Sequence, residues 1–529
     1  MKILNLSLII FLVSIPFAYS QLTLVKDINT GNEQSFAYRI SVVCNGNAYF
    51  VANDGVSGHE VWKSDGTTSG TSLCKNIFPG NETCNPQAFG TDNKLVYFLA
   101  NDSLHGNELW KTDGTVSGTQ LVIDSKPGVA NSKIYVPFNE YETFAFINEK
   151  NYFLQNDGLY ETDGSSNGTK LLYSIPVSYD LEKHNNLIYF VGRVSFYDSI
   201  YVFNPTTNKI QAIKYNFRSP GSLVSTPIGL LVSDNDKLYN INSTLNTVTD
   251  ITPVESISSY SLKNAASFHK GFYYFVATNR NDKLKPYLFR TNGLTGGTQV
   301  YANISLDNFS SYGYFKSEGD YLFFFYNSAS SMPTELWRTD GTVSGLVKLD
   351  SYNSSSLNSI SPAKNVVGHL RKIYYFGQKD DEISLYESDG TQVGTKPIAL
   401  IDDGFASRQL TTGLMKLKNL LLFSAAVKSN KSIGEELWSF ALPIDTKNND
   451  LNEQIISFSP NPVHDKVKIE INSDIRCNYS IMNLCGVELV KDTELNNSRI
   501  ISFEKFVPGI YFISLNLNGT LKCIKIIKE

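Results

Sequence analysis

A short motif recurs along the sequence at nearly constant intervals, and this repeat is the strongest constraint on the fold. Its fullest copy runs from Glu108 to Thr119 and reads Glu-Leu-Trp-Lys-Thr-Asp-Gly-Thr-Val-Ser-Gly-Thr. Eight copies, whole or degenerate, keep an Asp or Asn at one place, at positions 65, 113, 163, 204, 242, 292, 340 and 389. Successive positions are 48, 50, 41, 38, 50, 48 and 49 residues apart, and Trp438 marks a truncated ninth copy. Such regularity predicts one structural unit repeated about nine times.

Each unit contains about four short apolar runs separated by tight polar turns. In the second unit an aromatic run, Val96 to Leu99, precedes the motif, and Leu121 to Ile123 follows it. Four-stranded sheets repeated with this period are typical of a β-propeller. We therefore predict an all-β fold whose main part, residues 21–441, is a β-propeller-like domain of 7–9 blades. The degenerate copies at Asn204 and Asn242 leave open whether the middle units merge or splay.

The motif itself is predicted to be structural. Leu and Trp alternate with Glu and Lys, so one face of the strand is apolar and packs on the next blade. The Asp-Gly pair then makes the turn, because Gly tolerates positive φ and Asp accepts hydrogen bonds from backbone amides. The predicted structural repeat residues are Trp62, Asp65, Gly66, Trp110, Asp113, Gly114, Asp163, Gly164, Trp337, Asp340, Gly341, Asp389, Gly390 and Trp438.

The N-terminal run Leu22 to Ile28 resembles the apolar run that follows the closing Gly-Thr of each complete unit. The last copy, at Trp438, lacks that run. We therefore expect the N-terminal strand to complete the final blade. Such a closure hides sheet edges that an open array would expose.

Residues 1–20 have the pattern of a signal peptide. Lys2 precedes the apolar stretch Leu4 to Phe17, and Ala18-Tyr19-Ser20 is a small-x-small cleavage signal, which predicts cleavage between Ser20 and Gln21. The alternative is a membrane anchor, but the stretch is short for a span of about 20 residues and no second candidate follows. We expect an exported mature chain without a transmembrane segment. Its net charge of −5 has no long runs, so nothing indicates a nucleic-acid partner.

The repeat period is lost after residue 441. Residues 442–454 form a polar linker, and residues 455–529 contain short alternating strands such as the one carrying Val467, Ile469 and Ile471. Over about 75 residues, such strands predict a small β-sandwich.

Two resemblances follow from these motifs. The repeat resembles the ELWxxDGT repeat proteins, an exported bacterial family defined mainly by its repeat, over residues 21–441. Residues 455–529 are similar to the C-terminal sorting domain of the type IX secretion system and end in a Lys-rich run. The motif residues that carry this second resemblance are Pro460, Asn461, Pro462, Gly486, Pro508, Gly509 and Tyr511.

The second resemblance implies a route and a destination. The signal peptide would carry the chain across the inner membrane of a Bacteroidetes-like bacterium, and the type IX secretion machinery would carry it across the outer membrane. The protein would then be secreted or attached to the outer-membrane surface, with the tag removed.

Cysteine and histidine spacing does not indicate a metal site. No Cys-x-x-Cys pair occurs, and no histidine pair has helical metal-ligand spacing. Cys74 occupies an apolar slot, where we expect a small buried side chain. His59 and His105 flank motif glutamates in neighbouring units, in surface turns or, alternatively, in a shared polar site. Disulfide pairing stays open for Cys44, Cys74, Cys84, Cys477, Cys485 and Cys523.

We expect no cofactor and no catalytic residue. Calcium bound by Asp65, Asp113, Asp340 or Asp389 is an alternative, although the loops contain few acids. No P-loop or dinucleotide motif is present. The favoured function is a binding or scaffold module for an extracellular glycan or protein.

Two other functions stay open, a propeller hydrolase acting on extracellular polysaccharide and an adhesin. Three or more converging Asp, Glu or Arg side chains at the channel mouth would favour the hydrolase. Since a ring needs the same turn many times, any functional site should lie where the units differ.

Overall fold

A computed structural model describes most of the chain beyond residue 21. The described residues are 22–30, 33–36, 41–132, 134–135, 143–155, 157–176, 178–194, 197–213, 217–242, 247–255, 257–279, 285–302, 314–327, 333–353, 366–380, 382–402, 413–427, 433–443, 456–459, 465–471, 477–483, 488–495, 498–517 and 520–528.

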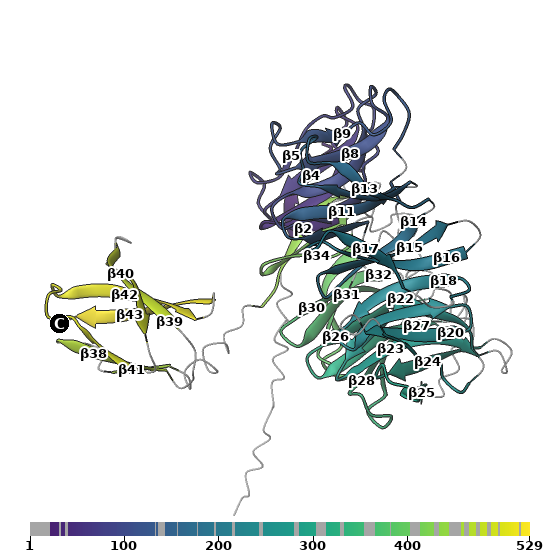
Figure 1. The fold of residues 1–529 in the computed structure, drawn as a ribbon. Helices are drawn as coiled ribbons and strands as arrows, with labels where there is room; N and C mark the ends of the chain where they lie inside the picture. The colour runs from purple at the N-terminus through teal and green to yellow at the C-terminus, as the bar shows by residue number, and fades with distance from the viewer. Residues whose placement is uncertain are drawn as a thin grey trace, which may run out of the picture. The chain divides into compact units, whose positions relative to one another are not determined.

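The chain divides into two compact units, Met1–Leu442 and Pro443–Glu529. All regular elements of the described residues are β-strands (Figure 1). The described part of the chain accordingly contains no helix of the length and apolarity needed to cross a membrane.

The first unit contains nine four-stranded antiparallel sheets, which are the blades of a β-propeller. Eight blades use four consecutive strands each, and the first strand in each blade is called its inner strand. Blades 1 to 4 consist of β2 (Ser41–Cys44), β3 (Asn47–Asn53), β4 (His59–Ser64) and β5 (Ser72–Leu73); β6 (Gln87–Thr91), β7 (Val96–Asn101), β8 (Asn107–Thr112) and β9 (Gln120–Ile123); β10 (Phe144–Ile147), β11 (Lys150–Gln155), β12 (Gly158–Thr162) and β13 (Lys170–Ser174); and β14 (Ser178–His184), β15 (Leu187–Val194), β16 (Tyr197–Asn204) and β17 (Lys209–Ala212).

Blades 5 to 8 follow the same order. They consist of β18 (Pro220–Thr226), β19 (Gly229–Asp234), β20 (Lys237–Asn242) and β21 (Thr247–Asp250); β22 (Ile257–His269), β23 (Phe272–Asn279), β24 (Lys285–Thr291) and β25 (Thr298–Ala302); β26 (Tyr314–Glu318), β27 (Tyr321–Asn327), β28 (Thr334–Thr339) and β29 (Val347–Tyr352); and β30 (Val367–His369), β31 (Lys372–Lys379), β32 (Glu382–Ser388) and β33 (Lys396–Asp402).

The ninth blade joins the two ends of the ring. Its sheet order is β1 (Thr23–Lys26), β36 (Glu436–Ala441), β35 (Leu420–Ala425) and β34 (Met415–Leu417). Strand β1 pairs antiparallel with β36, so that Thr23 faces Ser439 and Leu24 faces Trp438. The predicted closure by the N-terminal strand is confirmed.

The structure has nine blades, at the upper end of the 7–9 expected from the repeat. The degenerate copies at Asn204 and Asn242 end β16 and β20, and each of these is the third strand of its own blade. The middle units therefore neither merge nor splay, and nine units make nine blades. Inner strand β34 contacts β2, and Lys416 Nζ on β34 donates to Gly368 O on β30 at 3.0 Å, so blade 9 touches both neighbours.

The apolar cores lie mainly between neighbouring blades. One cluster combines Tyr49 and Cys74 of blade 1 with Phe98 and Trp110 of blade 2. Cys44, Cys74 and Cys84 are buried there as free thiols, and the expectation of a buried Cys74 is confirmed. Because each blade packs chiefly on the next, the stability of the ring depends on nearest-neighbour interfaces.

The second unit contains two antiparallel sheets, the elements expected for a small β-sandwich. One has the order β37 (Ile456–Ser459), β38 (Lys466–Ile471) and β41 (Ser498–Ser502). The other has the order β40 (Glu488–Leu495), β39 (Cys477–Asn483), β42 (Gly509–Leu517) and β43 (Thr520–Lys528). Side chains of both sheets are buried, among them Val467, Ile481 and Ile513.

Deleting residues 22–30 should destabilise the whole ring. The deletion removes β1 and the buried side chains Val25 and Ile28, whose burial is worth about 3–6 kcal/mol in total. Thermal and urea unfolding of the full chain should show this loss. Thr23→Ala, which changes an exposed side chain of the same strand, is the control. An unchanged melting temperature after the deletion would contradict closure by β1.

Candidate functional site

The complete motif copies form the turn between the third and fourth strands of their blades. In blade 2, Asp113 Oδ1 accepts hydrogen bonds from Thr115 N at 2.8 Å and Thr115 Oγ1 at 2.7 Å. Thr115 Oγ1 accepts in turn from Gly118 N at 2.9 Å. These hydrogen bonds, led by that from the Thr115 side chain, lower the pKa of Asp113. Equivalent backbone hydrogen bonds are accepted by Asp65, Asp163, Asp340 and Asp389.

The glycines of this turn are required by close approaches. Gly114 has a φ of 87°, and a Cβ there would lie 2.8 Å from the hydroxyl of Tyr49 in the preceding blade. A Cβ on Gly164 would likewise lie 2.9 Å from the Tyr97 hydroxyl. Gly66, Gly341 and Gly390 also have positive φ. The Asp-Gly turn is therefore a joint between neighbouring blades as well as a connection within one blade.

The motif tryptophans lie in the same interfaces. Trp62, Trp110 and Trp438 are almost fully buried, and Trp337 is half-buried. Lys26 Nζ of blade 9 lies 5.7 Å from the ring centroid of Trp62 in blade 1, a distance typical of a cation–π contact. Lys75, which follows β5, repeats this contact with Trp110 in blade 2 at 5.6 Å.

The motif glutamate contradicts the simple alternation expected from the sequence. The motif Glu and Trp are two residues apart and share one side of the strand. Glu60, Glu108 and Glu436 are fully buried there, so this side carries a buried polar group beside the Trp. Glu60 accepts from the backbone amides of Ile77 and Phe78 at 3.1 and 3.0 Å. These amides belong to the segment that leads to the next blade and would otherwise be buried without a partner.

Glu436 does the same for the ring closure. It accepts from Ile28 N at 2.6 Å and from Ser35 Oγ at 2.5 Å, in the segment that follows β1. Burial raises the pKa of Glu60 and of Glu436 to about 7, against the lowering influence of their hydrogen bonds. The recurrence of Glu at one motif position was the available sequence signal for this role.

The sorting motif is partly described. Tyr511 OH donates to Val507 O at 2.7 Å, and its ring packs on Phe506 with centroids 5.2 Å apart. Pro508 precedes β42, and Gly509 begins that strand. The predicted residues Ser20, Gln21, Pro460, Asn461, Pro462 and Gly486 lie outside the described residues, as does Cys485.

Two histidines form a recurring contact that sequence reasoning missed. His184 ends β14, and its Nδ1 lies 3.0 Å from Ser225 Oγ on the next inner strand. His269 ends β22, and its Nδ1 lies 2.8 Å from Ser317 Oγ on β26. Burial lowers the pKa of both imidazoles. The shared signal was a histidine directly before the turn into an aromatic strand. The other histidines singled out lie elsewhere: His59 begins β4, and His105 Nδ1 lies 2.8 Å from Asp102 Oδ2 in a turn.

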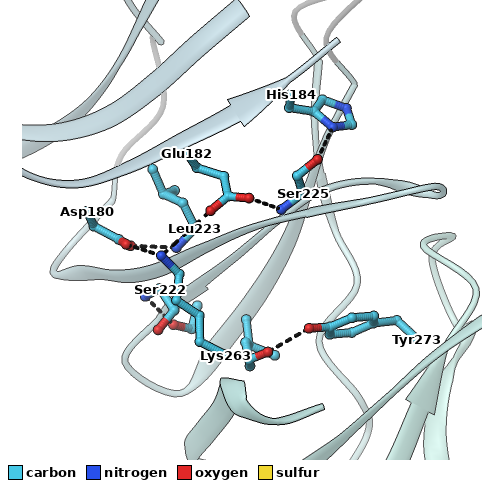
Figure 2. A network of polar contacts seen from close by, with 10 residues as sticks. Asp180, Glu182, His184, Ser222, Leu223, Ser225, Lys263 and Tyr273 are labelled. Atoms are coloured by element: carbon cyan, nitrogen blue, oxygen red, sulfur yellow. Dashed lines mark hydrogen bonds and ion pairs between the residues drawn. The ribbon is translucent and has the colours of Figure 1, made fainter. Parts of the chain in front are cut away.

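The inner strands of blades 4, 5 and 6 all depart from regular pairing. Each has a β-bulge or register shift, between Tyr179 and Glu182, Pro220 and Leu223, and Ser261 and Ala266. The irregular segments contain chemically different residues: Asp180 on β14, Ser222 on β18 and Lys263 on β22. Asp180 has a φ of 55°. Figure 2 shows how the resulting polar contacts lie.

Two carboxylates and one ammonium meet at these bulges. Asp180 Oδ2 accepts from Leu223 N at 2.6 Å, and Glu182 Oε1 accepts from Ser225 N at 2.9 Å. Lys263 Nζ is ion-paired with Asp180 and lies 3.7 Å from Glu182 Oε2 (Figure 2). The carboxylates thus cap amides on the edge of β18 and neutralise a lysine of blade 6. Burial raises the pKa of Asp180, while Lys263 opposes that shift.

This cluster is built to join blades. Its members, Asp180, Glu182 and Lys263, expose at most 18% of their side chains and are engaged with one another or with backbone amides. It contains two acids and no arginine, so it does not reach the three converging Asp, Glu or Arg side chains that would favour a hydrolase. Among the described residues, no group of three or more His, Cys, Asp or Glu side chains could hold a metal ion.

A groove between blades 2 and 3 offers space for a ligand. Its volume is about 960 Å³, and it is lined by the turns Thr91–Leu95 and Asn148–Lys150 and by Phe89, Thr143 and Phe146, among others. Thr143 Oγ1 is buried at the groove and has no hydrogen-bond partner among the described residues. Space and an unused polar atom make this groove the candidate binding site.

The second unit matches a known family. Residues 457–529 match the model of the secretion system C-terminal sorting domain, Por_Secre_tail. This tail implies that the chain is delivered by the type IX secretion system and is secreted or attached at the cell surface. No curated protein matches the sequence significantly.

Solved structures similar to the chain include several propeller proteins. A prolyl endopeptidase is 11% identical at a TM-score of 0.37, over 68% of this chain and 55% of its own, so the chain spans little more than half of that protein. The propeller domain of the Trilobed protease from Pyrococcus furiosus is 12% identical at a TM-score of 0.30, over 68% and 95%. The extracellular domain of a putative one component system from B. thetaiotaomicron is 10% identical at 0.28, over 97% and 98%. Likenesses this distant carry no information on activity.

Gly118→Ala should destabilise the ring by about 1–3 kcal/mol, because the new Cβ would lie 2.0 Å from Asp113 Oδ1 and the turn would have to open. Val116→Ala changes an exposed residue of the same turn and should stay within about 0.5 kcal/mol. Urea unfolding of the full chain measures both. Equal stability of the two variants would show that the turn tolerates the Cβ.

The contribution of Glu436 to stability should fall as pH rises from about 4.5 to about 7. In the folded chain, burial holds the proton on Glu436 up to about pH 7, whereas the ordinary value is 4.5, so the folded state binds more protons in this window. The unfolding free energy of the wild type minus that of Glu436→Gln should therefore decrease across the window, by on the order of 1–3 kcal/mol. Glu335→Gln, at the same motif position in blade 7, is the matched control. If the difference in unfolding free energy between the wild type and Glu436→Gln did not change with pH, the raised pKa of Glu436 would be refuted.

Proposed function

We propose that this protein is an extracellular binding module whose propeller presents a ligand groove between blades 2 and 3. The groove itself carries the proposal, because it combines a volume of about 960 Å³ with a buried hydroxyl on Thr143 that has no partner within the described part of the chain. Small-molecule sites typically measure about 300–1,000 Å³ and orient their ligands with a few polar groups.

Three other polar features of the ring are engaged in contacts within the protein, which supports the groove as the binding site. The motif aspartates are engaged in their own turns, as Asp113 is with Thr115. The Asp180–Lys263 pair and the His184–Ser225 pair join inner strands of different blades. A ring held by such contacts is rigid, and rigid scaffolds present binding loops in a fixed arrangement.

The sorting tail supports an extracellular setting for this activity. Delivery by the type IX system places the groove where glycans and surface proteins are available. Release into the medium and attachment to the surface both allow such binding.

The test is a binding screen of the purified full chain against arrays of glycans and peptides, with groove variants alongside. We expect at least one specific ligand whose binding is lost in Phe146→Ala. Phe268→Ala is the matched control, because Phe268 on β22 has the register position of Phe146 on β10 and is also half-buried. Absence of any specific ligand, or ligands unaffected by Phe146→Ala, would overturn the proposal.

A further inference from the structure

Beside the groove, the inner strands of blades 2 and 3 carry different residues at one register position. Gly90 faces Tyr97 in blade 2, and Phe146 faces Asn151 in blade 3 at the equivalent place. A Cβ on Gly90 would lie 2.5 Å from Cδ2 of Phe144. Only glycine at position 90 therefore lets the Phe144 ring of blade 3 pack against blade 2. One side of the groove is thereby aromatic.

Aromatic side chains give the groove an apolar surface. Phe89 and Phe146 are half-buried, while Phe144 is buried behind them. Phe146 packs on Tyr97 with centroids 5.6 Å apart, and Phe89 packs on Phe98 at 5.7 Å. These contacts fix two rings whose remaining surface lines the groove.

The charges around the groove are of both signs, and most already have partners. Lys94 lies 3.5 Å from Glu149, and Lys150 Nζ lies 2.8 Å from Glu161. Lys183 Nζ donates to Phe146 O at 2.8 Å. The carboxylates at positions 92 and 163 accept backbone amides of their own turns. A charged ligand would therefore meet attraction and repulsion together.

The unused hydrogen-bonding capacity at the groove is neutral. Thr143 Oγ1 is buried with no partner in the ranges that the structure describes, and a hydroxyl both donates and accepts. Asn93 and Asn148 line the groove and are exposed, and their amides also supply donors and acceptors. Sugar hydroxyls pair with all three groups, and the C–H face of a pyranose packs on an aromatic ring.

We infer that the ligand of this groove is a neutral oligosaccharide, an inference that rests on the proposed binding function. The aromatic surface receives the C–H face of the sugar rings. Thr143, Asn93 and Asn148 bind hydroxyl groups. A volume of about 960 Å³ lies at the upper end of ordinary ligand sites, which fits several sugar rings better than one.

The test is calorimetric titration of the full chain with neutral hexasaccharides of glucose, xylose and mannose, and with a galacturonate hexamer of the same length. We expect one neutral hexamer to bind and the acidic hexamer to bind at least tenfold more weakly. Phe146→Ala should weaken the neutral ligand at least tenfold, and Thr143→Val about three- to tenfold, since a lost neutral hydrogen bond has about this effect. Phe268→Ala should change the affinity less than twofold.

Asn148→Gly keeps the test valid if a phenylalanine variant fails to fold, because Asn148 is exposed in a turn and has a φ of 51°, which glycine adopts readily. It should weaken the neutral ligand about threefold or more. Equal or tighter binding of the acidic hexamer, or neutral binding that these groove variants leave unchanged, would overturn the inference. A peptide ligand lost in Phe146→Ala would overturn it too, while leaving the proposed function standing. Failure of every array member to bind would remove both.

Discussion

The pairing of the first strand with the last motif strand is the constraint on which the rest of the ring depends. Strand β1 supplies the outer strand of a blade whose other three strands come from the end of the ring. Without it, the edge of β36 and the buried carboxylate of Glu436 would lose their partners together. Since each blade is stabilised by its neighbours, loss of this closure would weaken the interfaces on both sides of the ninth blade.

The recurring motif is best understood as a set of contacts between blades. Its aspartate and threonine fix the turn, its glycines admit the tyrosine of the preceding blade, and its buried glutamate holds the segment leading onward. In blade 2 these roles fall to Asp113, Gly114 and Glu108, and Glu108 accepts from Ser125 N at 2.9 Å. Repetition follows from this mechanical role. The residues that bind something else are expected where repetition fails, at the inner strands and the groove.

The sequence allowed the architecture to be predicted because the repeat is local information. Blade composition, the closure by Leu22 to Ile28 and the burial of Cys74 all followed from aligning units with one another. The burial of Glu436 could not be read this way, because its partner Ile28 lies 408 residues earlier in the chain. The His184–Ser225 contact and the groove likewise join residues of different blades. Such sites depend on how units face each other, which no single unit encodes.

The closure also dictates the order in which the protein can mature. Leu24 precedes the strands of all eight other blades in the chain, whereas its partner Trp438 follows them. Until that partner is synthesised, the chain carries an unpaired strand at one end and an open sheet at the other, both of which favour aggregation. The sorting unit follows the last blade directly in sequence. The last strand of the ring and the sorting unit therefore become available at the same stage. The chain can be delivered only once it also contains every strand needed to close the ring.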